Sequence, residues 1–538
     1  MAMQADLIVI NGRIWTGEAH QPYAEALAIQ GDSIVAVGDN AQIRAVSSRK
    51  TRVVDAGGHM VMPGFIDNHT HLLVGGLQLL SLDLRAVQNQ AEFVQAVAAC
   101  AATTRPGSWI TGGGWNNDQW PGGQAPAKEW IDGVTARIPV FLARSDLHIG
   151  FANSAALKLA GITRNTADPA GGTIMREPGS GEPSGILKDN AMRLVQQCMP
   201  APSAERYDQA LAAAMQHAAR VGVTSVQDIT AWTDWHDWQT FVRFKEQGRL
   251  TLRIYARTQI TEWQKQLELI AAGFRGDDWL RLGGVKGFVD GSLGSGTALM
   301  FEPYQDAPAT AGLLADQMLP AGIMQERIAA ADKAGLPVAI HAIGDKANHM
   351  LLDIFAAVIQ ANGRRDRRFR IEHAQHLVPE DIHRMAELGI LASVQPGHVQ
   401  ADGCWAEQRI GRRRCQMTYA FRSLAAAGVS LSFGTDWPVV PLNPFPGIYA
   451  AVTRRTQDGR NPDGWVPEQK LAVAECLQAY TYGSAYAEFG ENAKGTLKVG
   501  KLADVIVVSQ DVLTARPEDI AGTKVLCTIA GGKIVYQA

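Results

Sequence analysis

The chain has 538 residues, 46% of them hydrophobic and 19% charged, so it can build a large core and is too long for one ordinary domain. Its formal net charge of -3 provides no basic field for nucleic acid and no cationic surface for an anionic membrane. These properties argue against nucleic acid and membrane as partners and favour a small-molecule substrate.

The cysteines and the first residues indicate a compartment. The six cysteines are scattered without a CxxC spacing, which is typical of a reducing environment. The first ten residues lack the basic and apolar parts of a signal peptide, and no window approaches the roughly 18 apolar residues of a membrane span. We therefore expect a cytoplasmic protein.

Short β-rich runs occupy both ends of the chain. Residues 5–62 alternate such runs with Asn-Gly and Gly-Asp turns, which predicts tight hairpins. Similar runs recur at 503–508, 525–529 and 533–536. Neither set is wide enough to bury a face alone, so we expect the two to pair into one β-sandwich domain formed by 1–60 and 485–538.

The most informative stretch is 63–71, which ends in His69-Thr70-His71. If residues 61–66 form a buried strand, both histidines lie just beyond its carboxyl end. The two-residue period of a strand then points both imidazoles to the same side. Such a pair can chelate a metal ion, and the signal gains strength only if other ligands recur at other strand ends.

Between the terminal segments, apolar runs alternate with amphipathic helical stretches, as in parallel β/α units. Eight runs imply a closed barrel over 61–484 with its active site at the carboxyl ends of the strands. The surplus length, at about 75–205, is interpreted as an insertion after the first strand that forms a lid or pocket wall, or else as an inert surface subdomain. The expected strands are 61–66, 223–227, 252–256, 282–289, 337–340, 369–372, 390–394 and 429–433.

Side chains that bind metals do recur at these strand ends. Four histidines and one aspartate at one barrel mouth suit Zn²⁺ or a similar divalent ion. A lysine lies in the fourth strand on the way to the same mouth. The residues are His69, His71, Lys286, His341, His373 and Asp436.

On these motifs the chain resembles the amidohydrolase superfamily, in its amidohydrolase-3 or YtcJ-like branch, which includes N-substituted formamide deformylases. The resemblance covers nearly the whole length and is most specific at 63–71, 285–294, 341–345 and 434–438. It implies a distorted (β/α)8 TIM barrel with a small β-sandwich built from both termini. A homodimer is a family-level expectation.

The resemblance also implies how the ligands divide between ions. One divalent ion, the more buried, would be held by His69, His71 and Asp436, and a second by His341 and His373. Zinc is the expected metal, with one or two ions per chain.

Lys286 has two interpretations. The resemblance implies that it bridges the ions as an N6-carboxylated side chain, a carbamate formed with CO₂. An ammonium cannot ligate a cation, whereas a carbamate supplies two anionic oxygens. Alternatively, Lys286 remains an amine, paired with Asp290, and a single metal binds.

A metal-activated water is the expected nucleophile, with Asp436 as the general base that accepts its proton and delivers it to the leaving nitrogen. The metal, or a nearby donor such as His148 or His398, would polarise the scissile carbonyl, although either histidine could be an ordinary loop residue.

Fewer residues indicate the substrate than indicate the metal. Trp115 and Trp437 fall in expected loops on or near the catalytic face and suggest an apolar or aromatic ligand surface. Arg176 could bind a substrate carboxylate, or pair with a local acid such as Glu177.

The sequence thus predicts a metal-dependent hydrolase that cleaves a C–N amide bond, N-formyl or N-acyl, of a hydrophobic or aromatic small molecule. Two alternatives use the same scaffold: deamination of an N-heterocycle, and opening of a lactone or ester. A non-catalytic binding protein on a decayed barrel is a third, and retention of all the ligands argues against it.

Overall fold

The computed structural model describes residues 4–105, 107–117, 120–144, 149–169, 172–189, 191–230, 235–274 and 276–538. The chain divides into two compact units. One consists of Met1–Leu72 with Met215–Ala538, and the other of Leu73–Ala214. The segment interpreted above as an insertion, about 75–205, falls within the second unit.

The first unit contains an eight-stranded parallel sheet that curls into a nearly closed, distorted barrel, as predicted. Strands and helices alternate along the chain, so each parallel strand is reached by a helical crossover. In sequence order the strands are β8 (Phe65–Thr70), β15 (Val223–Ile229), β16 (Arg253–Gln259), β17 (Leu280–Phe288), β18 (Val338–Ala342), β19 (Arg370–His373), β20 (Leu391–Val394) and β21 (Leu431–Phe433).

The barrel helices follow clear sequence signals. In α11 (Asp345–Asn362), Leu351, Phe355 and Val358 are buried at helical spacing. Helix α12 (Pro379–Leu388) begins with a proline and ends at Gly389, whose φ of 67° suits a helix C-terminus. The other helices of this unit are α1 (Asn40–Ala45), α8 (His236–Glu246), α9 (Trp263–Ala271), α10 (Ile323–Lys333), α13 (His398–Asp402), α14 (Ala406–Cys415), α15 (Phe421–Ala426), α16 (Pro444–Thr453), α17 (Val473–Gln478) and α18 (Ser484–Ala487).

The first and last barrel strands meet through a short loop instead of a full ladder. A single parallel bridge joins Thr70 to Trp437. The backbone N–H of Asp436 donates to His69 O at 2.8 Å, and that of His71 donates to Trp437 O at 2.8 Å. The seam of the barrel therefore runs directly through three of the predicted metal ligands.

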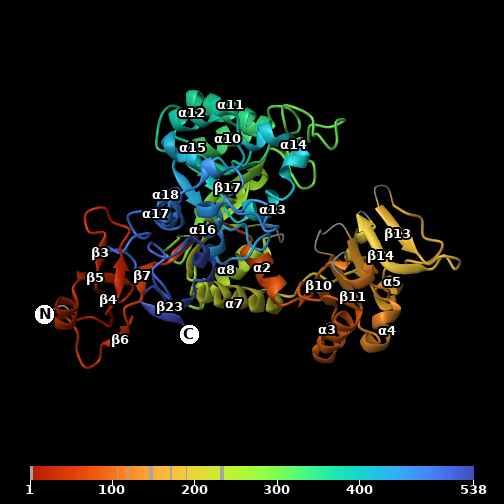
Figure 1. The fold of residues 1–538 in the computed structure, drawn as a ribbon, viewed down its shortest axis with the longest axis horizontal. Helices are drawn as coiled ribbons and strands as arrows, with labels where there is room; N and C mark the ends of the chain where they lie inside the picture. Colours follow the sequence, from red (N-terminus) through yellow and green to blue (C-terminus); the bar gives the residue numbers. More distant parts are fainter. Residues whose placement is uncertain are drawn as a thin grey trace. The chain divides into compact units, whose positions relative to one another are not determined.

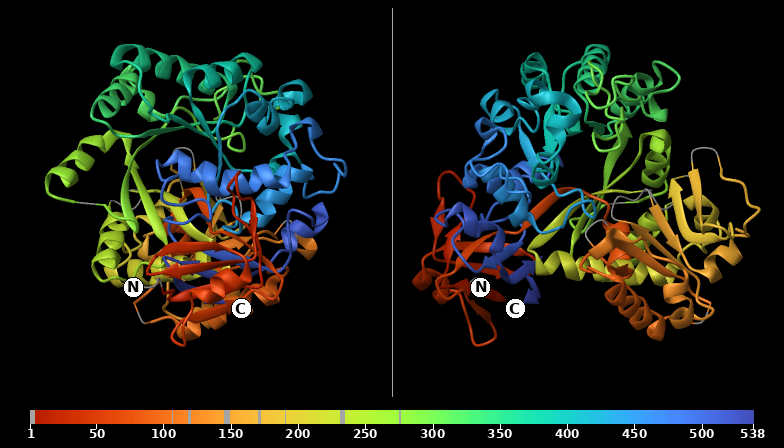
Figure 2. Two further views of the ribbon diagram at one scale, coloured as in Figure 1. Left: turned by 90° about the vertical axis from the view of Figure 1, so that its left-hand side faces the viewer. Right: turned by 45° about the vertical axis from the view of Figure 1, so that its right-hand side comes forward.

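Both ends of the chain contribute to the predicted β-sandwich, and one of its sheets contains strands from both. The order of this sheet is β24-β23-β22-β7-β2-β3, and the red amino-terminal and blue carboxyl-terminal strands lie side by side in every view (Figures 1 and 2). Its strands are β2 (Arg13–Trp15), β3 (Tyr23–Ala24), β7 (Met60–Pro63), β22 (Val505–Val508), β23 (Val525–Ala530) and β24 (Lys533–Gln537).

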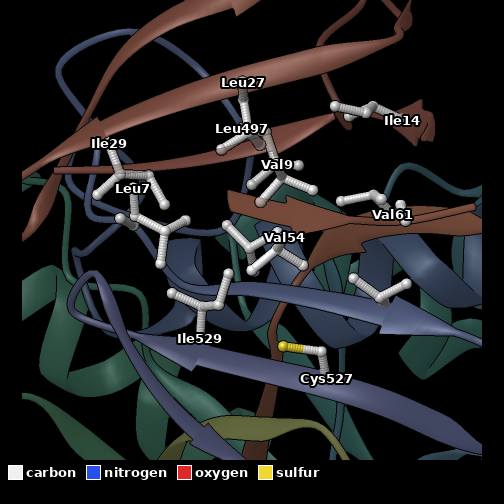
Figure 3. Packing of buried hydrophobic residues seen from close by; sticks show 14 of the residues in the cluster. Leu7, Val9, Ile14, Leu27, Ile29, Val54, Val61, Leu497, Cys527 and Ile529 are labelled. Atoms are coloured by element: carbon white, nitrogen blue, oxygen red, sulfur yellow. The ribbon is translucent and has the colours of Figure 1, made fainter. Parts of the chain in front are cut away.

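A second terminal sheet, of order β5-β4-β1-β6, packs against the first. Figure 3 shows apolar side chains from both sheets, such as Leu7, Ile29 and Ile529, interdigitating between them. Burial of these faces against each other makes the pair a sandwich. The strands are β1 (Leu7–Ile10), β4 (Ala26–Gln30), β5 (Ser33–Gly38) and β6 (Arg52–Asp55).

The structure differs from the expected first barrel strand, 61–66. Two strands occupy this stretch, and they change partners at Gly64: β7 pairs with β22 of the sandwich, and β8 pairs with β15 of the barrel. Only glycine fits here, since a Cβ on Gly64 would lie 2.3 Å from Thr224 Oγ1. As a result β8 extends to Thr70, and His69 lies inside the strand, not beyond it.

The second unit has a six-stranded sheet of order β13-β14-β12-β11-β10-β9 with its own apolar core, which includes Phe93, Val140 and Phe151. Its elements are β9 (Leu82–Asp83), α3 (Gln90–Thr103), β10 (Ile110–Trp115), α4 (Glu129–Thr135), β11 (Val140–Arg144), β12 (Ile149–Ala152), α5 (Ser154–Leu159), β13 (Gly172–Arg176), β14 (Pro183–Asp189) and α6 (Met192–Gln196). Helices α2 (Leu72–Leu79) and α7 (Ala204–Arg220) run across the boundaries between the units. Among the described helices, none combines the length and apolar character needed to span a bilayer.

Candidate active site

A cavity of about 410 Å³ lies at the carboxyl ends of the barrel strands. All six predicted metal ligands line it, although they come from five different strands or the loops that follow them. The parallel direction of the strands explains this convergence, because every carboxyl end faces the same mouth. The ligands are His69 in β8, His71 after it, Lys286 in β17, His341 in β18, His373 ending β19 and Asp436 after β21.

Three of these residues form a compact cluster. The Oδ1 atom of Asp436 is 3.5 Å from His69 Nε2 and 3.3 Å from His71 Nε2. One ligand atom from each side chain lies within 4.8 Å of the other two. Two imidazoles and a carboxylate at this spacing can share one divalent cation.

The loop before Asp436 is held by buried contacts to β8. Asp67 accepts hydrogen bonds from Thr435 N and from Thr435 Oγ1, the latter at 2.6 Å. A Cβ on Gly434 would lie 2.6 Å from His69 N, so the close approach of the two backbones requires glycine. Asp436 itself has a φ of 64°, a backbone conformation that residues other than glycine rarely adopt. Strained backbone of this kind is commonly found at functional sites.

Glu372, which the ligand pattern did not single out, fixes the tautomer of His69. Its Oε2 is 2.6 Å from His69 Nδ1, and its Oε1 accepts from Arg370 Nε at 2.6 Å. Burial alone would raise the pKa of Glu372, but Arg370 and His69 hold that pKa well below its usual range. The ionised carboxylate accepts Nδ1–H, which leaves the lone pair of His69 on Nε2.

This arrangement is suitable for a cation. Burial, together with the Lys286 ammonium, lowers the pKa of His69 to about 4, so the imidazole is neutral. Its Nε2 lone pair then faces Asp436 Oδ1, a buried atom without a hydrogen-bond partner in the described part of the chain. Although burial opposes ionisation of Asp436, the surrounding histidines keep the pKa of this carboxyl well below normal. Two electron-rich atoms in such proximity fit a divalent ion between them.

His341 and His373 form the other side of the cavity, with ring centroids 4.5 Å apart. Burial and Lys286 lower the pKa of His341 to about 3, and burial with His341 beside it lowers the pKa of His373 well below normal. His341 Nε2 is 3.0 Å from Gly291 O, so Nε2 carries the proton and Nδ1 the lone pair. Both rings are neutral and can therefore ligate a metal.

Lys286 lies between the two sides and is almost completely buried. Burial lowers its pKa to about 8, which brings the amine closer to the neutral form that reacts with CO₂. Asp290, the suggested partner of an unmodified Lys286, instead accepts hydrogen bonds from Leu299 N, Ile343 N and Gly344 N. His341 Nε2 lies 3.5 Å from Asp290 Oδ1.

His398, at the start of α13, lies beside Asp436, with Nε2 3.6 Å from Asp436 Oδ2. Burial opposes its charged form, but Asp436 and Asp402 raise its pKa above the usual value. His148, the alternative candidate for polarising a carbonyl, lies outside the described residues.

None of the three predicted substrate residues is among the described residues that line the cavity. Trp437 is 5% exposed, packs against His217 and is not among the described residues that line the cavity. Trp115 lies in β10, not in a loop, and is fully buried, with Nε1 donating to Leu142 O. Arg176 donates to Thr166 O and lies 3.5 Å from Asp168, its acidic neighbour in place of Glu177. Trp115 and Arg176 belong to the second unit, and the substrate roles of all three stay predictions.

Other side chains form an apolar wall of the cavity. Phe288, Leu293, Ile343, Trp405 and Val439 supply an apolar surface to the cavity. Periodicity in the sequence could not identify them, because most lie in loops or after strand ends, where spacing carries no directional information. Asp402 and Gln375 add polar groups to this wall.

A parallel barrel whose strand ends present neutral histidines and an ionised aspartate to a cavity defines a metal-dependent hydrolase that uses a divalent ion. The chain belongs to the amidohydrolase family: the model described as "Amidohydrolase family" matches residues 52–536. It falls in the YtcJ-like branch of that family.

Three relatives match nearly the whole chain. Protein LONG AFTER FAR-RED 3 of Arabidopsis thaliana is 42% identical over 99% of this chain and 92% of its own length. Putative amidohydrolase YtcJ of Bacillus subtilis is 32% identical over 98% of each chain. N-substituted formamide deformylase of Arthrobacter pascens is 27% identical over 100% of this chain and 99% of its own.

Among solved structures, an uncharacterized metal-dependent hydrolase from Pyrococcus furiosus superposes with a TM-score of 0.77 at 30% sequence identity. The match covers 94% of this chain and 100% of that one. The similarity therefore includes the barrel, the terminal sheets and the intervening segment.

Proposed function

We propose that this protein hydrolyses a C–N amide bond, N-formyl or N-acyl, in a hydrophobic or aromatic small molecule. The observation that carries the proposal is the cluster of His69, His71 and Asp436 at one end of a cavity with an otherwise largely apolar wall. The similarity to a protein named N-substituted formamide deformylase supports a carbon–nitrogen bond as the target.

Zinc is the proposed ion, because neutral imidazoles and a carboxylate are its usual protein ligands outside thiolate sites. His69, His71 and Asp436 would hold one ion. His341, His373 and a carboxylated Lys286 would complete a second position on the other side of the cavity. When bound, such an ion supplies Lewis-acid chemistry and lowers the pKa of water.

The side chains would then act on water and amide in sequence. Asp436 accepts a proton from the attacking water while the new C–O bond forms at the carbonyl carbon. His398, 3.6 Å from Asp436 Oδ2, is placed to donate a hydrogen bond to the oxygen that gains negative charge. Asp436 next returns the proton to the leaving nitrogen as the C–N bond breaks. The products are a carboxylic acid and an amine.

The apolar wall would bind the body of the substrate and reduce the access of bulk water. Phe288 and Trp405 provide aromatic surface, and Leu293 and Val439 provide aliphatic surface. Burial of an apolar substrate group against such a wall contributes roughly 25 cal/mol for each Å² removed from water. Hydrophobic amides are therefore preferred over small polar ones.

Metal analysis followed by a hydrolysis screen tests this function. The purified protein is loaded with Zn²⁺, its metal content is measured per chain, and N-formyl amines, N-acyl amines, amino-substituted N-heterocycles and lactones are compared. We expect release of an acid and an amine from the formamides or N-acyl amines. Turnover confined to the heterocycles or the lactones would contradict the proposal and favour a deaminase or a lactonase.

A further inference from the structure

Helix α13 connects the catalytic end of the cavity to its apolar wall. It begins at His398, beside Asp436, and ends at Asp402, four residues later. Residues four apart lie on the same helix face and about 6 Å apart along the axis. Asp402 also lines the cavity, next in sequence to the turn that carries Trp405.

The two oxygens of Asp402 have different surroundings. Oδ2 accepts hydrogen bonds from Gln375 Nε2 at 3.0 Å and from Tyr419 Oη at 2.6 Å. These two contacts fix the carboxylate and account for its structural role. Oδ1 accepts no hydrogen bond within the described part of the chain, and Asp402 is partly exposed and lines the cavity.

Asp402 differs from the other ionisable residues that line the cavity. Most of the ionisable groups of the lining belong to the predicted metal centre or, like His398, touch Asp436 directly. Of the described residues in the lining, Asp402 is the one acid outside the ligand set. A partly buried carboxylate that lines a cavity and has one oxygen without a hydrogen bond favours a hydrogen-bond donor there, and a cationic donor most strongly.

We propose that Asp402 is a specificity residue whose Oδ1 accepts a hydrogen bond from an N–H group on the body of the substrate. The inference rests on the proposed hydrolase function, which places the scissile carbonyl beside His398 and Asp436. The substrate class then becomes narrower: an apolar amide that carries an amine or amide N–H roughly 6 Å from the bond that is cleaved. Trp405 and Phe288 contact the carbon skeleton between the two polar ends.

Matched substrates test this class directly. N-formyl diaminoalkanes of increasing chain length are compared with N-formyl alkylamines of the same length, using the zinc-loaded protein. A hydrogen bond to a charged group predicts a kcat/KM about ten- to a hundred-fold higher for the diamine at the favoured length. Equal kcat/KM values for the two series at every length would overturn the inference and leave the amide hydrolase function intact.

Variants assign the preference to one oxygen. Asp402→Asn is expected to remove the preference for the diamine, so that kcat/KM falls about ten- to a hundred-fold more for the diamine than for the alkylamine. Asp402→Glu, one methylene longer, is expected to shift the preference to a shorter diamine. Glu407→Gln is the matched control, because Glu407 is an exposed acid on the next helix that does not line the cavity. A preference that survives Asp402→Asn contradicts the proposal.

A binding measurement separates this inference from the hydrolase function. Benzylammonium, benzyl alcohol and benzyltrimethylammonium are titrated into the zinc-loaded protein and followed by tryptophan fluorescence or calorimetry. We expect benzylammonium to bind about tenfold more tightly than benzyl alcohol, and more tightly than the trimethylated ion, which carries charge without an N–H. Equal affinities in the wild type refute the role of Asp402 even if no amide is hydrolysed. If the affinities differ while no amide is cleaved, only the proposed reaction fails.

Discussion

The two sides of the catalytic cavity differ in how completely the protein alone forms them. On the β8 and β21 side, the histidine nitrogens and the aspartate oxygen already lie within 4.8 Å of one another. Glu372, Arg370 and Asp67 hold that geometry through buried hydrogen bonds. On the β17 to β19 side, the two imidazoles are close, but their third partner is an amine.

This difference indicates which of the two proposed metal positions binds its ion first. A preformed set of ligands loses little conformational freedom when it binds an ion, whereas the ligand set that we propose for the other side is complete only after Lys286 is carboxylated. We therefore expect one tight position and one that depends on CO₂. The variants below test that asymmetry, from the largest expected effect to the smallest.

Replacing Asp436 should have the largest effect, because we propose that this residue both holds the first ion and transfers the proton. Asp436→Asn keeps the shape but cannot accept a proton as a carboxylate does. We expect kcat to fall about 10²- to 10⁴-fold, with weaker binding of the first ion. Steady-state kinetics and metal content are measured together, and a variant that binds metal yet retains full turnover would refute the mechanism.

Lys286→Ala tests the other side alone. It should lose one ion while the tight position stays filled, and kcat should fall roughly a hundredfold. Short carboxylic acids should restore part of the activity by supplying the missing carboxylate oxygens. Lys286→Arg is the control, since arginine keeps a positive charge but forms no carbamate. If arginine preserves activity, Lys286 acts as a cation and the bridging role is wrong.

Glu372→Gln tests what preforms the tight position. The side-chain amide of glutamine has one oxygen, which can accept a hydrogen bond from His69 or from Arg370. Its NH₂ group then faces the other of these two donors. Metal affinity at the first position should fall about 10- to 100-fold, as measured by competition with a chelator. Ser393→Ala is the matched control: its hydroxyl also donates to Glu372 Oε2, but it does not contact His69. Unchanged affinity in Glu372→Gln would mean that the tautomer of His69 is set by other contacts.

Gly434→Ala should have the smallest effect, and it should appear as lost stability. The added methyl would lie 2.3 Å from Asn68 Oδ1, so the loop must move away from β8. A shift of this kind costs about 1–3 kcal/mol and lowers the melting temperature. Thermal unfolding of the metal-free protein measures it, with Gly522→Ala as control because a Cβ there meets no atom within 4 Å. Equal melting temperatures for the two variants would show that the loop adapts without strain.

Much of the fold could be read from the sequence because two periodic signals dominate it. Alternating apolar runs and helices predicted eight parallel strands, and the structure has eight in one sheet. The β runs at both termini predicted a shared β-sandwich, and the structure has one, in which β7 pairs directly with β22. The six ligand candidates line one cavity because parallel strands bring their carboxyl ends to one mouth.

The remaining features depend on contacts that periodicity does not encode. Glu372 precedes a predicted ligand, but only its 2.6 Å contact with His69 shows its part in the site. Trp115 appeared as a loop aromatic, whereas the core of the second unit buries it completely. The division of the first strand at Gly64 depends on Thr224, about 160 positions away, which no local pattern contains.

The pairing of β7 with β22 also has a consequence during biosynthesis. Val505 and Pro63 are neighbours in the finished sheet but are about 440 positions apart along the chain. At ordinary ribosomal speeds, β7 waits roughly 20–90 s for its partner to emerge, with one edge uncovered. Newly made chains are therefore exposed to edge-to-edge aggregation during that interval. The strand left uncovered, β7, lies only one glycine upstream of the strand that carries His69, so aggregation at this edge would also keep the candidate metal site from forming.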